Sequence, residues 1–151
     1  MQSLWLPAIH AQLALNHNNP PLALKLLQAA LPPAEFGVIT FAADVSGSCL
    51  YSVHLRGEAY LAAGQGRAAV AEFQKILDHS GIVRNCWTGA LAHLGKARAN
   101  VLESKAEQGA DADAARVRAI TAYKELLSLW QDADPAIPIM KQAKAEYAKL
   151  Q

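Results

Sequence analysis

The chain has 151 residues, of which 52% are apolar and 18% charged, and its formal net charge is +1. This length suits one domain with a sizeable core, and the near-neutral charge without basic runs argues against nucleic-acid binding. No run of about 18 apolar residues is present to span a bilayer. A signal peptide begins with a positively charged region, but no Lys or Arg precedes Lys25 in this chain. We therefore expect a soluble, cytoplasmic protein that inserts into no membrane.

The N-terminal part of the chain predicts two helices, at about 3–16 and 20–31. The turn His17-Asn18-Asn19 separates them, and Pro20-Pro21 suits the first turn of a helix, where a missing N–H costs nothing. Pro32-Pro33 ends the second helix. These features predict a helical hairpin at the start of the chain.

A long connection follows this hairpin. The link at 34–48 contains a β-prone, apolar Val-Ile-Thr-Phe core, which we expect to pack over a groove or an edge. Cys49 comes directly after the link, and Cys86 is the second cysteine of the chain. With only two cysteines, we expect both to be reduced and to pack as small apolar side chains between helices. A disulfide framework is not expected.

The stretch RGEAYLAAGQGRAAVAEFQKIL at 56–77 predicts a second hairpin. Small residues at Gly57 and Ala69 allow two antiparallel helices to approach closely, and Phe73 fills the space beside them. Gly64 ends the first of the two helices, where a positive φ costs a glycine little. This spacing resembles the tetratricopeptide (TPR) repeat, a helix–turn–helix unit of about 34 residues that stacks on its neighbours.

A third unit follows the same pattern with longer helices. The interval from Asn100 to Tyr123 is 23 residues, against 13 for the matching interval in the second unit. The added residues are mostly good helix formers, so we expect both helices of this hairpin to be extended. The turn is predicted near Gly109-Ala110-Asp111, with an Asp capping the second helix.

The end of the chain predicts a terminal capping helix, which repeat arrays need for solubility. Its apolar face consists of Ile137, Met140, Ala143, Tyr147 and Leu150. Its polar side chains are mostly on the outside and consist of Lys141, Lys144, Glu146 and Lys149. The whole predicted domain, 1–151, comprises a first repeat at about 3–33, the link 34–48, a second repeat at about 50–83, an elongated third repeat at about 87–131 and a capping helix at about 136–151.

Three segments carry a further resemblance: GEAYLAAGQGRAAVAEFQKILDHSGIV, GALAHLGKARA and LWQDADPAIPIMKQAKAEYAKL. They resemble the helical C-terminal regions of bacterial serine/threonine protein kinases of the acidobacterial type. The two resemblances imply an all-α fold, in which TPR-like antiparallel hairpins stack into a right-handed α-solenoid closed by the capping helix. They also imply a protein–protein interaction module attached to, or derived from, a signalling protein. The chain carries no glycine-rich phosphate loop and no His-Arg-Asp or Asp-Phe-Gly triplet, so no kinase chemistry is expected.

The sequence offers little for catalysis or metal binding. His10 and His17 are seven residues apart, as are His79 and Cys86, and neither pair matches a zinc-site spacing. The Ser46-Gly47-Ser48 run lacks the strand–turn–helix context of a nucleophile elbow. We expect no enzymatic activity, no cofactor and no metal.

In TPR arrays the first helix of each unit lines the concave face. The matching positions in this chain are Trp5, Gln12, Asn16, Tyr51, His54, Glu58, Leu61, Leu94, Arg98 and Val101. The mixture of apolar and polar residues favours a helix or loop of a partner protein over an acidic C-terminal tail. Trp5, Tyr51 and Arg98 are expected to contribute most, because aromatic and Arg side chains dominate binding energies. We therefore expect Tyr51→Ala and Arg98→Ala to weaken partner binding and to leave thermal stability nearly unchanged.

Two other functions stay open for this face. In a self-associating structural domain, the groove would be filled by the link at 34–48 or by a second copy in a homodimer. A small-molecule-binding domain is the less favoured alternative. Neither alternative requires nucleic acid or a membrane.

Overall fold

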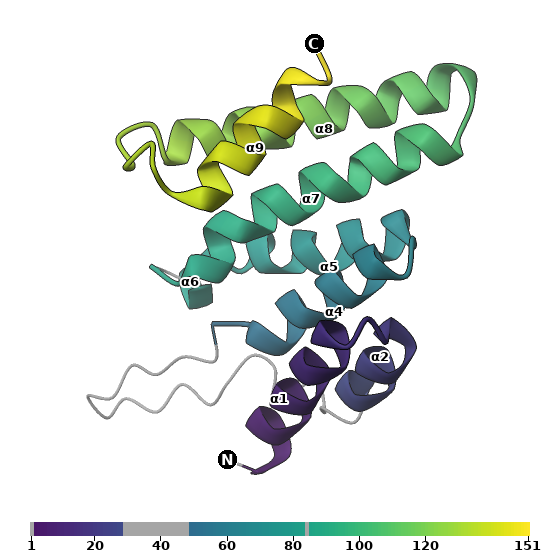
Figure 1. The fold of residues 1–151 in the computed structure, drawn as a ribbon, viewed down its shortest axis with the longest axis vertical. Helices are drawn as coiled ribbons and strands as arrows, with labels where there is room; N and C mark the ends of the chain where they lie inside the picture. Colours follow the sequence, from purple (N-terminus) through teal and green to yellow (C-terminus); the bar gives the residue numbers. More distant parts are fainter. Residues whose placement is uncertain (1, 29–48, 84) are drawn as a thin grey trace.

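The computed structural model describes residues 2–28, 49–83 and 85–151, and these residues form helices joined by turns and bends, with no strand among them (Figure 1). The predicted all-α class is confirmed. The helices are α1 (Gln2–Asn16), α2 (Pro20–Gln28), α4 (Tyr51–Ala62), α5 (Gly66–Asp78), α6 (Ser80–Val83), α7 (Trp87–Ala106), α8 (Gly109–Leu129) and α9 (Pro138–Ala148). Within the described ranges, none of these helices is both long and apolar enough to cross a bilayer.

Successive helices pack as three antiparallel hairpins, α1–α2, α4–α5 and α7–α8. Each hairpin packs on the next through contacts of α2 with α4 and of α5 with α7. The first helices also contact one another, α1 with α4 and α4 with α7, and α9 packs on α8. Figure 1 shows the hairpins following one another along the long axis, with the two termini at opposite ends.

The turn of the first hairpin lies where the sequence predicts it, whereas the predicted end of its second helix, at 31–33, lies outside the described residues. α1 ends at Asn16, and α2 begins at Pro20. Ala23 and Leu27 of α2 are fully buried in a cluster with α1 and α4. The predicted link at 34–48 lies outside the described residues.

The core of the second hairpin is built around Phe73, whose ring is fully buried. A Cβ added to Gly57 of α4 would lie 2.7 Å from this ring, and one added to Gly95 of α7 would lie 2.3 Å from it. The ring therefore occupies space that only glycines leave free on both neighbouring helices. Gly64 has φ 72° at the end of α4, which confirms the predicted turn. The predicted close approach at Gly57 is also confirmed, whereas the matching role of Gly95 was not predicted.

We expect Gly57→Val and Gly95→Ala each to lower the free energy of unfolding by about 1–3 kcal/mol, because each adds atoms against a filled core. Urea unfolding followed by circular dichroism would measure the loss. Gly81→Ala is the matched control, since a Cβ at this exposed position meets nothing within 4 Å. Unfolding midpoints equal to that of the parent would show that Phe73 is not held between these glycines.

The third hairpin is longer than the second, as the spacing of its residues predicts. α7 and α8 have 20 and 21 residues, against 12 and 13 in α4 and α5. The predicted Asp cap is wrong. α8 starts at Gly109, with φ 59°, and its N-cap residue Gln108 makes no side-chain capping bond. Asp111 consequently lies inside the first turn of α8. Its negative charge interacts favourably with the helix dipole there, but it does not cap the helix.

The prediction of reduced cysteines is also wrong. Cys49 and Cys86 form a disulfide, with their Cα atoms 5.7 Å apart. They precede α4 and α7, whose N-terminal ends lie together because the two helices pack side by side. The Thr88 hydroxyl donates a 2.6 Å hydrogen bond to the Cys49 carbonyl at the same place. The cysteines are 37 residues apart, so their pairing depends on how two hairpins stack and leaves no local signal.

The predicted terminal helix is present as α9. Met140 and Ala143 are buried, and Ile139, Tyr147 and Leu150 pack against the core of the third hairpin. The predicted polar residues Lys141, Lys144 and Lys149 are exposed. α9 therefore covers the apolar surface that α7 and α8 would otherwise expose.

Candidate functional site

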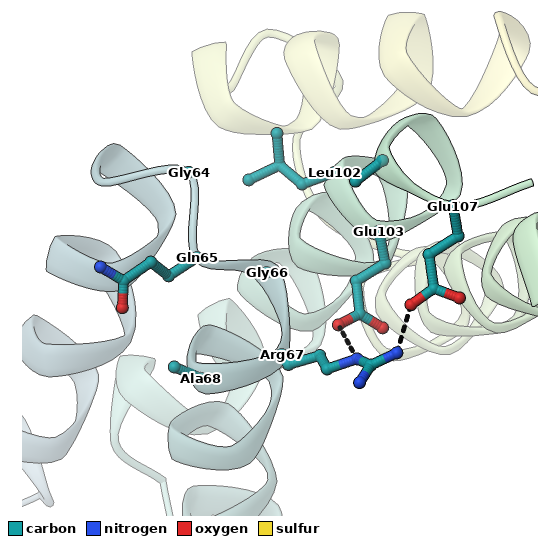
Figure 2. Close-up of a pocket in the computed structure, with 9 residues that line it drawn as sticks. Gly64, Gln65, Gly66, Arg67, Ala68, Leu102, Glu103 and Glu107 are labelled. Carbon is teal, nitrogen blue, oxygen red and sulfur yellow. Dashed lines mark hydrogen bonds and ion pairs between the residues drawn. The ribbon is translucent and has the colours of Figure 1, made fainter.

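A small pocket of about 380 Å³ lies where the turn between α4 and α5 approaches α7 (Figure 2). Gly66 allows this approach, because a Cβ there would lie 2.9 Å from the Ala99 carbonyl oxygen. Arg67 points at α7 and pairs with Glu107 and, at 3.6 Å, with Glu103. The charged groups of this pocket thus face one another, and Arg67 is 81% exposed, so its ion pairs add little to stability.

A larger cavity of about 670 Å³, here called the end cavity, lies around α6 at the ends of α5, α7 and α8. Its lining consists of Ile76, Leu77, Ser80, Val83, Asn85, Cys86, Trp87, Gly89, Ala90, His93, Leu129 and Trp130. His93 is its titratable side chain, and its Nδ1 lies 3.0 Å from a Glu125 oxygen. The end cavity is therefore mainly apolar and offers few groups that could orient a ligand.

A third cavity, of about 470 Å³, combines apolar and charged side chains and is here called the inner groove. Its lining residues come from the first helix of each hairpin and from α9. They are Gln12, Leu15, Asn16, His54, Leu55, Glu58, Ala62, Trp87, Leu91, Leu94, Gly95, Arg98 and Ile139. Apolar walls with a few converging polar groups are the usual composition of a binding site, so the inner groove is the candidate functional site.

Six of the ten residues predicted for a groove line this cavity: Gln12, Asn16, His54, Glu58, Leu94 and Arg98. Tyr51 instead packs against the first-hairpin core, with its ring 5.7 Å from that of Trp87. Leu61 and Val101 pack against the cores of the second and third hairpins. Trp5 lies in α1, and its side chain is outside the described part of the chain.

Trp87 and Leu91 also line the inner groove, although neither was predicted to do so. Helical spacing could have found them, since both lie on the same face of α7 as Leu94 and Arg98. Ile139 of α9 completes the lining, and no repeat position predicts it. Trp87 also borders the end cavity, and 49% of its surface is exposed.

His54 is the most buried polar side chain of the inner groove, with 6% of its surface exposed. Its ring makes edge contacts with the rings of Phe73 and Trp87, at centroid distances of 5.7 Å and 5.0 Å. Burial lowers the pKa of His54 from 6.5 to about 4, so the imidazole is neutral at pH 7. Its Nδ1 has no hydrogen-bond partner among the described residues.

Arg98 is held by a carboxylate from α9. Its guanidinium donates hydrogen bonds of 2.9 Å and 2.8 Å to the two oxygens of Glu146, and the Tyr123 hydroxyl donates a third, of 2.8 Å. Burial alone would raise the pKa of Glu146, but the bonds from Arg98 and Tyr123 outweigh it and the pKa is lowered. Glu146 therefore turns inward, unlike the other polar residues of its helix.

The ion pair between Arg98 and Glu146 gives Arg98 a role in stability as well as in the groove. We expect Arg98→Ala to lower the free energy of unfolding by about 1–2 kcal/mol, because it removes two charge-assisted bonds between α7 and α9. Thermal unfolding would measure the effect. The control is Arg67→Ala, whose ion pairs are more exposed and should cost well under half as much. Equal losses in the two variants would show that the Arg98 pair does not fasten α9.

No protein family, curated protein or solved structure matches this chain. Among residues 2–28, 49–83 and 85–151, no three His, Cys, Asp or Glu side chains gather as a metal site would require. What the inner groove does must therefore be inferred from its geometry and chemistry.

Proposed function

We propose that this chain is a TPR-like protein-binding module, a right-handed stack of helical hairpins whose inner groove holds a segment of a partner protein. One observation carries the proposal. A single groove receives side chains from α1, α4 and α7, the first helices of three successive hairpins, and from the terminal helix α9. The mutual contacts of these first helices support the stacked arrangement, since they bring distant parts of the sequence to one face.

The composition of the inner groove favours a peptide or helix over a small molecule. Its residues are spread over four helices, and the groove joins apolar side chains such as Leu15, Leu91 and Ile139 to separated polar groups. An amphipathic segment presents the same alternation of apolar and polar side chains along its length. Binding a small molecule is the less favoured use of this surface.

The cellular context is part of the proposal in two respects. Attachment to a signalling protein such as a serine/threonine kinase rests on the sequence resemblance, and the domains encoded next to this chain would test it. The predicted cytoplasmic location is weakened by the Cys49–Cys86 disulfide, because the cytoplasm keeps thiols reduced. The disulfide favours an oxidising compartment.

Peptide selection would test the proposed function. A library of random linear peptides displayed on phage is selected against the full chain at pH 7 without reductant, and affinities are measured by calorimetry. We expect Trp87→Ala to weaken the selected peptides about tenfold or more, as for an aromatic hot spot. Trp87 borders both cavities. Leu129→Ala is therefore the control, since Leu129 lines the end cavity and is not part of the inner-groove lining. Loss of affinity in Leu129→Ala, with Trp87→Ala unaffected, would contradict the proposal.

Self-association is the second candidate, and a specific surface favours it. Leu6, Ile9 and Leu13 lie at helical spacing on α1, and each is about half exposed. A second copy covering this stripe would bury apolar surface. Light scattering over a dilution series tests this function: a dimer that dissociates on dilution and is weakened by Ile9→Lys supports it. A monomer at all concentrations excludes it.

A further inference from the structure

Glu58 is a charged residue of the inner groove whose carboxylate forms no hydrogen bond or ion pair among the described residues. It lies one turn after His54 on α4 and is partly buried. Arg98 acts on it only through its charge. Burial raises the pKa of Glu58, and the charge of Arg98 offsets part of that rise. A carboxylate in this position would gain from a partner that brings its own positive charge.

Arg98, the cation that lines the inner groove, makes its hydrogen bonds to Glu146 and none to Glu58. Arg98 directs two hydrogen bonds to Glu146, which also accepts the Tyr123 hydroxyl. Lys149 lies close enough to act on the charge of Glu146 but does not line the groove. Glu146 therefore engages one edge of the Arg98 guanidinium, and an incoming carboxylate could pair with that edge only by displacing Glu146.

A second polar group beside Glu58 is also without a partner. His54 is more than nine-tenths buried, lines the same groove, and its Nδ1 has no hydrogen bond among the described residues. This nitrogen is enclosed by the protein, so a bound segment would meet the neutral ring of His54 and not its Nδ1. Trp87 contacts the His54 ring and offers indole surface on which an aliphatic stem can lie.

We infer that the inner groove selects a partner segment in which a Lys or Arg side chain stands between apolar residues. The cation pairs with Glu58, and its stem lies along Trp87. The flanking apolar residues meet Leu15, Leu91 and Ile139. An acidic segment is disfavoured, because it would meet the unpaired Glu58. This inference rests on the proposed function and adds the chemistry of the partner.

The test uses the random phage-displayed peptides and the full chain at pH 7 without reductant. We expect selected peptides to be enriched in Lys or Arg flanked by apolar residues. Replacing that Lys by the uncharged norleucine, or Glu58 by Gln, should each weaken binding about tenfold or more. Glu107→Gln is the matched control, because Glu107 lies in the pocket with Arg67, away from the inner groove. Melting curves of Glu58→Gln should show no loss of stability, since the substitution removes an unpaired charge.

The outcomes separate the inference from the function on which it rests. Peptides that need Trp87 but carry no basic residue, and bind Glu58→Gln as tightly as the parent, would overturn the inference and leave the proposed function standing. Enrichment of acidic peptides would do the same. If no peptide is selected, or if selected peptides are insensitive to Trp87→Ala, both are overturned.

Discussion

Reduction of the Cys49–Cys86 disulfide is expected to lower the free energy of unfolding by about 2–4 kcal/mol. The bond joins residues 37 apart and therefore restricts a long loop of the unfolded chain. In the folded protein it fastens the start of α7 to the start of α4. Urea unfolding with and without a phosphine reductant would measure the loss.

A double variant, Cys49→Ser with Cys86→Ser, is the control for this experiment. It should match the reduced parent, and reductant should not change its unfolding midpoint. Reduction should also weaken peptide binding, because Trp87 directly follows Cys86 and borders the inner groove. Equal midpoints for the oxidised and reduced parent would contradict the stabilising role of the disulfide.

Acidification is expected to destabilise the protein through His54. Its pKa is lowered by burial from 6.5 to about 4, so between these values the unfolded chain binds a proton that the folded protein excludes. Stability is therefore unaffected above pH 6.5 and is lost as the pH falls towards 4, by a total on the order of 3 kcal/mol. Unfolding free energies measured from pH 7 to pH 4 would show this slope.

Two substitutions separate His54 from its neighbours. His54→Leu cannot titrate, so its stability should depend much less on pH in this window. Glu58 has the opposite effect on stability. Its pKa is raised in the folded protein, so the folded protein takes up this proton before the unfolded chain does, and stability gains as the pH falls towards 4.5. Glu58→Gln should therefore steepen the acid loss. A parent whose stability stays constant down to pH 4, with the same profile for His54→Leu, would contradict the burial of a neutral His54.

Local patterns predicted the features that depend on one hairpin alone. Gly57 and Gly64 were correctly assigned to a close helix contact and a turn, because each position has a steric requirement within its own unit. The extended α7 and α8 followed from a longer interval between matching residues. Counting repeat positions also identified six residues of the inner groove, since a shared register places them on the same helix face.

Features that depend on contacts between hairpins were missed. Gly95 faces Phe73 of the preceding hairpin, so its requirement comes from a residue outside its own unit. Glu146 appears as one polar residue among several on α9, and only the packing of that helix against α7 brings it to Arg98. The pairing of Cys49 with Cys86 likewise depends on which helix ends lie together.

The central claim is that the inner groove is the surface that binds a partner. Photo-crosslinking tests it most directly: a selected peptide carrying a benzophenone is irradiated with the full chain, and the attachment sites are mapped by mass spectrometry. We predict attachment to groove-lining residues of α1, α4 and α7, such as Asn16, Glu58 and Leu91. Attachment confined to the end cavity, around Ser80 and Leu129, or to the exposed stripe of α1 would contradict the claim.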